Sequence, residues 1–294
     1  MNYTLFIDIG SNTIKALLAC FEGGSLRPLG EFSLPRRISA KGGLSEEAAN
    51  IITSSVLELN SLARAKLKKD FETVCFGTSA LRDSPNSKQV LRELLARGIC
   101  VRVLTGEQEA KLSFKGAMGD EALRGKDLQN ALYGDLGGGS MEFVSKSGGG
   151  LAFESLPIGA VRLTNKFSES GVLDAEKLKN FCRQNLEKVE IPPSDFTLAI
   201  SGGAVTAARF ILGGGKLRAE SEVAMGDLKY CLEECETLGS EGLIKKYALP
   251  ANRVDILPAA FYCLIEVLKA AGRESFTHTR RSLRYGVAEL YYGI

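Results

Sequence analysis

The pattern that most constrains the fold of this chain is a strand, a glycine turn and a return strand, which occur twice. The first copy reads LFIDIGSNTIKALLACFEGGSL from Leu5, and the second reads LYGDLGGGSMEFVSKSGGGLAF from Leu132. In each copy an apolar run ends in Asp-x-Gly, and the next apolar run follows too soon for a helix to intervene. A pattern that restarts in this way predicts two homologous domains.

Helical and strand patterns alternate through the rest of the chain, which indicates an α/β layer fold. The polar stretch 120–127, with Gly119 and Gly125, predicts the division between domains. We therefore expect an N-terminal domain over 1–124 and a C-terminal domain over 125–294, with a last helix at about 282–294 that can pack back on the first domain. Other helices are predicted over 44–69, 86–97, 107–118, 174–189, 227–238 and 256–271.

Charge and cysteine content narrow the classes of partner and compartment. The net charge is +2, from 37 basic and 35 acidic residues, which favours neither nucleic acid nor a membrane as the main partner. The N-terminus has no signal-peptide pattern, and no apolar run reaches the ~18 residues that span a bilayer. Seven scattered cysteines indicate buried thiols in a cytoplasmic protein, and a single histidine argues against histidine-based catalysis.

The two Asp-x-Gly turns are candidate phosphate sites. Backbone N–H groups of glycine turns can converge on an anion, and a Cβ would keep the phosphate away. Each turn taken by itself is more often an ordinary hairpin, but two in register argue for a shared role. The phosphate-binding residues predicted at these turns are Ser11, Asn12, Thr13, Gly137, Gly138, Gly139 and Ser140.

A cation is expected beside these turns, because an aspartate next to a bound phosphate is otherwise repulsive. Asp8 and Asp135 therefore suggest Mg²⁺ held largely through water, and Glu142 is placed to share that role. A third turn, with Gly202, Gly203 and Thr206, follows an apolar strand and opens a helix, whose N-terminus favours an anion. An ordinary strand-to-helix connection explains that third turn about equally well.

Eight segments, in this order, resemble the Ppx/GppA family of exopolyphosphatases and guanosine pentaphosphate phosphohydrolases: DIGSNT, GTSALRDSPN, TGEQEAKLSFKGA, DLGGGSMEF, SLPIGAVRLT, ISGGAVTAAR, RVDILPAAF and SLRYGVAEL. Together they span nearly the whole chain, although DLGGGS by itself also fits sugar kinases and actin-like ATPases. The resemblance implies an α/β fold of two actin-like (ribonuclease H-like) ATPase-superfamily domains with a cleft between them.

The resemblance also implies residue roles. Glu109, which the pattern by itself explains as a first-turn acid of a helix, would orient or deprotonate the attacking water, and Arg82 would contact the phosphate chain. Asp135 and Glu142 would hold Mg²⁺, or Mn²⁺ in its place, and the glycine turns would cradle phosphates. Gln108 departs from the family, which commonly has an acidic residue there. The resemblance is to short members of the family, so we expect a chain without the helical C-terminal extension of long members.

These patterns lead to one main hypothesis and two alternatives. The main hypothesis is metal-dependent hydrolysis of the terminal phosphoanhydride of inorganic polyphosphate or guanosine pentaphosphate. This reaction does not require a histidine, because phosphoryl transfer depends mostly on positioning and charge neutralisation. The alternatives are a sugar or acid kinase or ATPase of the same superfamily, and a non-catalytic regulator that binds polyphosphate or guanosine tetra- and pentaphosphate. A homodimer is an expectation from the family only.

Overall fold

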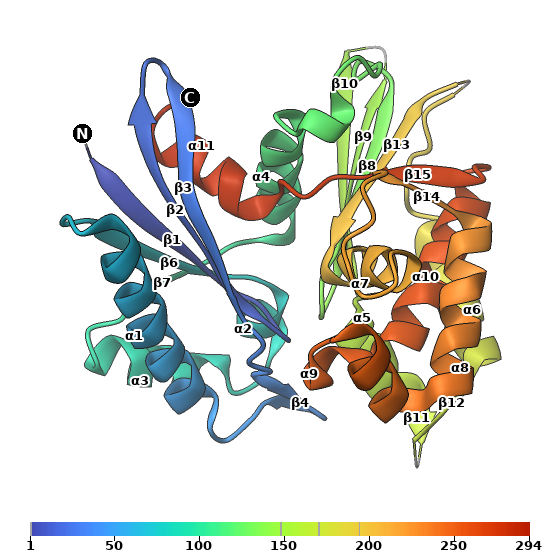
Figure 1. Cartoon of the computed structure of the whole chain (residues 1–294), viewed down its shortest axis with the longest axis horizontal. Coiled ribbons are helices and arrows are strands. Elements are labelled where there is room, and N and C mark those ends of the chain that lie inside the picture. Colours follow the sequence, from blue (N-terminus) through green and yellow to red (C-terminus); the bar gives the residue numbers. More distant parts are fainter. Residues whose placement is uncertain (1, 148, 170, 194) are drawn as a thin grey trace. The chain divides into compact units, whose positions relative to one another are not determined.

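The computed structural model describes residues 2–147, 149–169, 171–193 and 195–294 (Figure 1). Its contacts divide the chain into two compact units, Met1–Gly116 with Ser282–Ile294, and Ala117–Arg281. The first unit thus ends at Gly116 rather than at 124, and it includes the last segment of the chain. No helix among the described residues is both long and apolar enough to cross a membrane.

The first unit is built on a five-stranded sheet in the order β3-β2-β1-β6-β7. β1 pairs antiparallel with β2 and parallel with β6, so the Asp8 strand lies at the centre. The strands are β1 (Tyr3–Ile9), β2 (Ile14–Glu22), β3 (Ser25–Leu34), β6 (Glu72–Gly77) and β7 (Val101–Val103), with a small hairpin of β4 (Ser39–Ala40) and β5 (Gly43–Leu44). The helices are α1 (Ala48–Leu67), α2 (Ser79–Asp83), α3 (Ser87–Ala96), α4 (Gly106–Met118) and α11 (Leu283–Tyr291).

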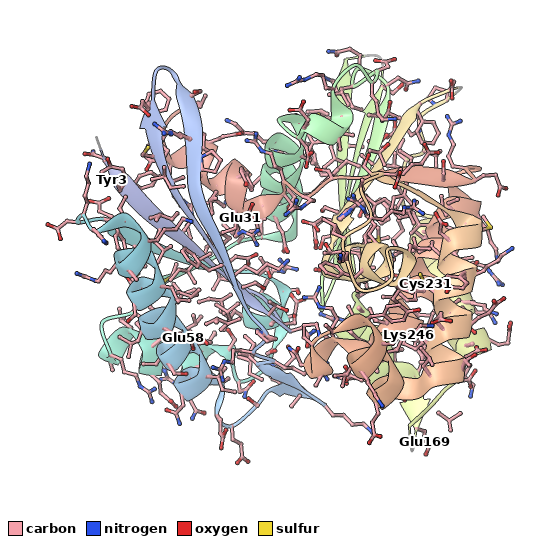
Figure 2. All side chains as sticks on the ribbon, viewed as in Figure 1. Tyr3, Glu31, Glu58, Glu169, Cys231 and Lys246 are labelled. Atoms are coloured by element: carbon pink, nitrogen blue, oxygen red, sulfur yellow. The ribbon has the colours of Figure 1, made fainter. Side chains whose placement is uncertain are left out.

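Alternate residues of β1 supply two different cores, as the two-residue period of a strand requires. Leu5 and Ile7 face a core that includes residues of α1 and α3. Phe6 faces the other way and packs in a cluster with residues of α11. Glu31 on β3, labelled in Figure 2, also holds α11 in place. It accepts hydrogen bonds from Arg284 and Tyr285, each at 2.8 Å. The C-terminal segment is therefore an integral part of the first unit.

The second unit repeats this plan with a sheet in the order β10-β9-β8-β13-β15-β14. Its strands are β8 (Ala131–Leu136), β9 (Met141–Ser147), β10 (Gly150–Leu156), β13 (Thr197–Gly202), β14 (Glu222–Ala224) and β15 (Ser275–His278), with a small hairpin of β11 (Ser168–Glu169) and β12 (Val172–Leu173). Its helices are η1 (Glu121–Leu123), α5 (Ala160–Phe167), α6 (Ala175–Leu186), α7 (Gly203–Leu212), α8 (Met225–Tyr247), α9 (Ala251–Val254) and α10 (Leu257–Ala270).

The repeat read from the sequence is confirmed as a repeat of topology. In each sheet the aspartate strand lies between its antiparallel return strand and a parallel strand, β6 in the first unit and β13 in the second. One face of the second sheet carries Leu132 and Phe143 into a large core that includes residues of α6, α7, α8 and α10. Alternation along the strands then places Asp135 and Glu142 on the opposite face. The predicted α/β class is confirmed.

Two local predictions need correction. The helix expected from residue 44 begins at Ala48, because Gly43–Leu44 pairs as β5 and the N–H of Ser45 donates to Ile38 O at 2.8 Å. The helix α5 was not predicted, since its apolar pattern extends over only eight residues. This helix supports one of the glycine turns described below.

Candidate active site

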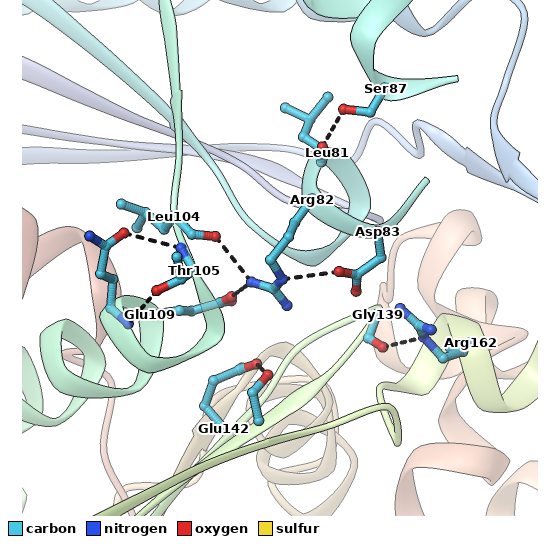
Figure 3. Close-up of polar contacts among 12 residues, drawn as sticks. Leu81, Arg82, Asp83, Ser87, Leu104, Thr105, Glu109, Gly139, Glu142 and Arg162 are labelled. Atoms are coloured by element: carbon cyan, nitrogen blue, oxygen red, sulfur yellow. Dashed lines mark hydrogen bonds and ion pairs between the residues drawn. The ribbon is translucent and has the colours of Figure 1, made fainter. Parts of the chain in front are cut away.

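In the first unit, Arg82 and Glu109 form an ion pair in which Arg82 Nη1 lies 2.8 Å from Glu109 Oε2 (Figure 3). Arg82 follows β6 and Glu109 follows β7, and these neighbouring parallel strands end at the same edge of the sheet. The guanidinium is held further by Leu104 O at 3.2 Å and Asp83 Oδ1 at 3.0 Å. The Glu109 side chain is only 9% exposed, so its carboxylate occupies a fixed and largely desolvated position.

The N-terminus of α4 explains how Glu109 is presented. The Thr105 hydroxyl accepts from Gln108 N at 3.2 Å, and Gln108 Oε1 accepts from Thr105 N at 3.1 Å. This reciprocal pair is a capping box, in which glutamine and glutamate serve equally. Gln108, which departs from the family pattern, therefore has a structural role that requires no negative charge.

The capping role of Gln108 makes a testable prediction. Gln108→Glu should leave activity and stability close to those of the parent chain, because a glutamate accepts the same hydrogen bond from Thr105. Gln108→Ala should lower the free energy of unfolding by about 0.5–1 kcal/mol, as loss of a cap interaction does. Urea unfolding measures the effect on stability, and the rate of substrate turnover measures the effect on activity. A large loss of activity in Gln108→Glu would contradict the assignment.

The second unit's glycine turn, between β8 and β9, is supported by α5. Ala160 N donates to Gly137 O and Arg162 N to Gly138 O, both at 3.0 Å, and Arg162 Nε donates to Gly139 O at 2.6 Å (Figure 3). All three carbonyls of the turn therefore face α5. In a trans peptide the N–H points opposite to the C=O, so the N–H groups that follow these carbonyls point away from α5. They form a candidate anion-binding nest.

Gly159 makes this support possible. A Cβ at this position would lie 2.3 Å from Ser140 N and 2.4 Å from the carbonyl carbon of Gly139, both backbone atoms that cannot give way. Only glycine therefore lets the start of α5 approach the turn this closely. The sequence contained this signal in the segment PIGAVRL, but nothing in the segment itself indicates what the glycine approaches.

Asp135 and Glu142 lie directly opposite each other on adjacent antiparallel strands. Residues so paired have Cβ atoms roughly 4.5–5.5 Å apart, and like charges in this position are destabilising. Glu142 is 1% exposed and accepts a hydrogen bond from Ser155 Oγ at 2.9 Å. Oxygen ligands from two carboxylates suit a hard divalent cation that keeps several waters, so the residues fit the expected Mg²⁺.

The equivalent position in the first unit is different. The register pairs Asp8 with Lys15 across β1 and β2, so this aspartate faces a protein cation on its own sheet face. Two acids therefore share a sheet face at Asp135 and Glu142, whereas an acid and a base share it at Asp8 and Lys15. Among the described residues, no group of three or more His, Cys, Asp or Glu side chains is arranged to hold a metal.

The first unit's glycine turn carries Ser11, Asn12 and Thr13, all of them buried. Ser11 O accepts hydrogen bonds from Ile38 N at 3.1 Å and from Ser39 N at 3.3 Å. These two bonds hold the segment after β3 against the turn. The turn is thus held by its own sheet and by one neighbouring segment.

The third turn opens α7 in the second unit. Thr206 Oγ1 donates to Gly202 O at 3.2 Å, so this hydroxyl supports the turn in the structure. Arg253 Nη1 donates to Gly203 O at 2.6 Å, and burial lowers the pKa of Arg253. A Cβ on Gly203 would lie 2.2 Å from Arg253 Nη1, so the arginine occupies the space that a side chain would need. Sequence reasoning singled out neither Arg253 nor Arg162.

The fold and these turns define an α/β protein of two units, each with a glycine turn beside the central strand of its sheet. An exopolyphosphatase from Cytophaga hutchinsonii aligns over 100% of this chain and 99% of its own with a TM-score of 0.83, at 20% sequence identity. Residues 31–290 match the Ppx/GppA phosphatase family. The chain therefore belongs to the Ppx/GppA phosphatase family.

The names of two relatives state an activity. Exopolyphosphatase 1 of Mycobacterium tuberculosis is 30% identical over 172 residues, which is 55% of this chain and 47% of that protein. The guanosine-5'-triphosphate,3'-diphosphate pyrophosphatase of Aeromonas hydrophila is 26% identical over 302 residues, which is 98% of this chain and 58% of that protein. The chain thus spans about half the length of the curated relatives it matches.

Proposed function

We propose that this protein hydrolyses the terminal phosphoanhydride bond of inorganic polyphosphate or of guanosine pentaphosphate. The observation that carries the proposal is Glu109, whose carboxylate is held 2.8 Å from Arg82 at the first turn of α4. A desolvated carboxylate in a fixed position is suited to accept a proton from an attacking water. The names of the two relatives, an exopolyphosphatase and a guanosine pentaphosphate pyrophosphatase, support the substrate class.

In the proposed reaction, water attacks the terminal phosphorus while Glu109 orients it and accepts its proton. The new P–O bond comes from water, and the bond to the bridging oxygen breaks, which releases inorganic phosphate and a chain shorter by one phosphate. Arg82 stabilises negative charge on the phosphate oxygens, and the N–H groups of Gly138, Gly139 and Ser140 bind oxyanions. Positioning and charge neutralisation dominate phosphoryl transfer.

Asp135 and Glu142 are proposed to hold Mg²⁺ or Mn²⁺. The bound ion would supply positive charge to the phosphate oxygens as charge develops on the leaving group. Before any metal binds, the two carboxylates face each other across β8 and β9. Ion binding relieves that repulsion, so the proposal explains why two acids are paired on one sheet face.

The experiment that tests the function measures phosphate release from polyphosphate, guanosine pentaphosphate and ATP in the presence of Mg²⁺. Release from either of the first two supports the hydrolase, and the faster substrate identifies the branch. Turnover of ATP only would favour the kinase or ATPase alternative. Tight binding of polyphosphate or guanosine pentaphosphate with no release of phosphate would favour the regulator.

Metal dependence gives a second prediction. An excess of EDTA should abolish phosphate release, and added Mg²⁺ should restore it. Asp135→Asn and Glu142→Gln should each raise the Mg²⁺ concentration for half-maximal activity by at least about tenfold, because even outer partners of metal ligands contribute that much. Asp70→Asn, which changes an exposed carboxylate, is the control. An unchanged Mg²⁺ requirement in both site variants would contradict the metal assignment.

A further inference from the structure

Adjacent arginines follow β3, and the structure gives them different surroundings. Arg36 Nη2 pairs with Glu58 Oε2 on α1 at 3.2 Å, with both side chains about half exposed. Figure 2 labels Glu58 on this helix. Arg37 is turned to the glycine turn of the first unit, where its Nε lies 2.7 Å from Asn12 Oδ1. The next residue, Ile38, is fully buried and donates its N–H to Ser11 O, so the backbone that carries Arg37 is fixed to this turn.

The contact with Arg37 determines which way the Asn12 amide points. An arginine N–H can only donate, so the amide atom that faces it must be the oxygen. The NH₂ group of Asn12 therefore occupies the other branch of the amide. Asn12 is only 7% exposed, which leaves this side chain little freedom to rotate.

This orientation matters for a phosphate ligand. Fully ionised phosphate oxygens accept hydrogen bonds and donate none, so an amide turned by 180° would present its oxygen to them and repel them. A carboxamide with its NH₂ toward the ligand adds donors without adding charge. The guanidinium that holds the amide adds a positive charge beside the turn.

We propose that Arg37 is a positioning residue for phosphate binding by the first glycine turn. It holds Asn12 with its oxygen toward Arg37 and its NH₂ group toward the bound phosphate chain. The inference rests on the proposed function in taking phosphate as the ligand, and it adds a residue whose action on that ligand passes through Asn12.

A double-mutant cycle tests this action, with the dissociation constant (Kd) for inorganic pyrophosphate and the KM for polyphosphate as readouts. Arg37→Met should raise both values about tenfold and leave kcat within about threefold, because a charge-assisted hydrogen bond contributes about that much. Asn12→Ala should have a similar effect. Arg37→Met in the Asn12→Ala background should then add little. Arg36→Met is the matched control and should change neither value.

The side-chain amide of Asn12 provides a readout that does not need turnover. Its ¹H–¹⁵N signals, assigned by their loss in Asn12→Ala, should shift in Arg37→Met and stay in place in Arg36→Met. Signals that do not move in Arg37→Met would overturn the proposal. Multiplicative effects in the cycle would also overturn it, since Arg37 would then act independently of Asn12.

Failure of the inference is distinguishable from failure of the proposed function. A wild-type chain that binds pyrophosphate but releases no phosphate from any substrate would refute the hydrolase, while the cycle and the amide signals would still test Arg37. A wild-type chain that does not bind pyrophosphate would overturn the inference directly, because Asn12 would have no phosphate to bind.

Discussion

Glu109→Gln is expected to lower the rate of phosphate release from polyphosphate or guanosine pentaphosphate by about 10²–10⁴-fold, the usual contribution of a general base. The amide has nearly the shape of the carboxylate, and its oxygen can still accept from Arg82 Nη1, which lies 2.8 Å from Glu109 Oε2. Substrate binding should therefore change little, and the loss should appear in kcat. Single-turnover measurements with saturating enzyme separate the chemical step from binding and release.

The neighbouring acid supplies the control for this experiment. Glu107 lies on the same first turn of α4, is 63% exposed and pairs with Lys111 one turn along the helix. Glu107→Gln should leave the rate within about twofold, because an exposed ion pair of this kind contributes little. Equal losses in the two variants would mean that negative charge at the helix N-terminus matters, and not a base at Glu109.

Gly286→Ala is expected to destabilise the protein by about 2 kcal/mol or more, although glycine to alanine within a helix ordinarily stabilises by up to ~1 kcal/mol. Gly286 lies in α11, and a Cβ there would sit 1.8 Å from Leu112 O and 2.6 Å from Leu112 C on α4. These are backbone atoms, so the two helices would have to move apart. Because α4 also carries Glu109, the shift should reduce activity as well as stability.

Gly226→Ala is the matched control, since Gly226 also lies in a helix, α8, and a Cβ there would meet nothing within 4 Å. Urea unfolding measures both variants, and a lower midpoint with an unchanged slope reports a loss of stability. A Gly286→Ala variant as stable as the Gly226→Ala variant would show that α4 and α11 do not approach as closely as described.

The fold was largely predictable because its signals are local in the chain. An apolar run that ends in Asp-x-Gly identifies a strand and its turn, and repetition of that unit predicted two homologous α/β domains. The order of the strands in the two sheets was found only in the structure. The helix at 107–118 was predicted within one residue, as α4 spans Gly106–Met118. The strand pairing before α1 was not predicted. β4 and β5 have only two residues each, which is too short to show the alternation of apolar and polar residues that identifies a strand.

The sequence predicted the residue types of the candidate site but not the contacts that these residues make. Arg82 and Glu109 were assigned from a family resemblance, while their contact depends on the adjacency of β6 and β7. Nothing in the sequence separates Arg37 from Arg36, and only the position of the glycine turn distinguishes a surface ion pair from a contact to Asn12. Both contacts, Arg82 with Glu109 and Arg37 with Asn12, join residues that are distant in the chain. The periodicity of a short segment does not predict contacts of this kind.

The amino-acid sequence by itself determined the α/β class, the repeated strand-turn-strand unit and the family, because strand periodicity, glycine turns and ordered motifs are properties of short segments. The tertiary structure decided how each turn is supported: α5 approaches the second turn through Gly159, and Arg37 contacts the first turn through Asn12. It also decided that Asp135 faces Glu142 while Asp8 faces Lys15, since strand register sets which charges share a sheet face. Backbone approach and register depend on packing between segments, which only the folded chain establishes.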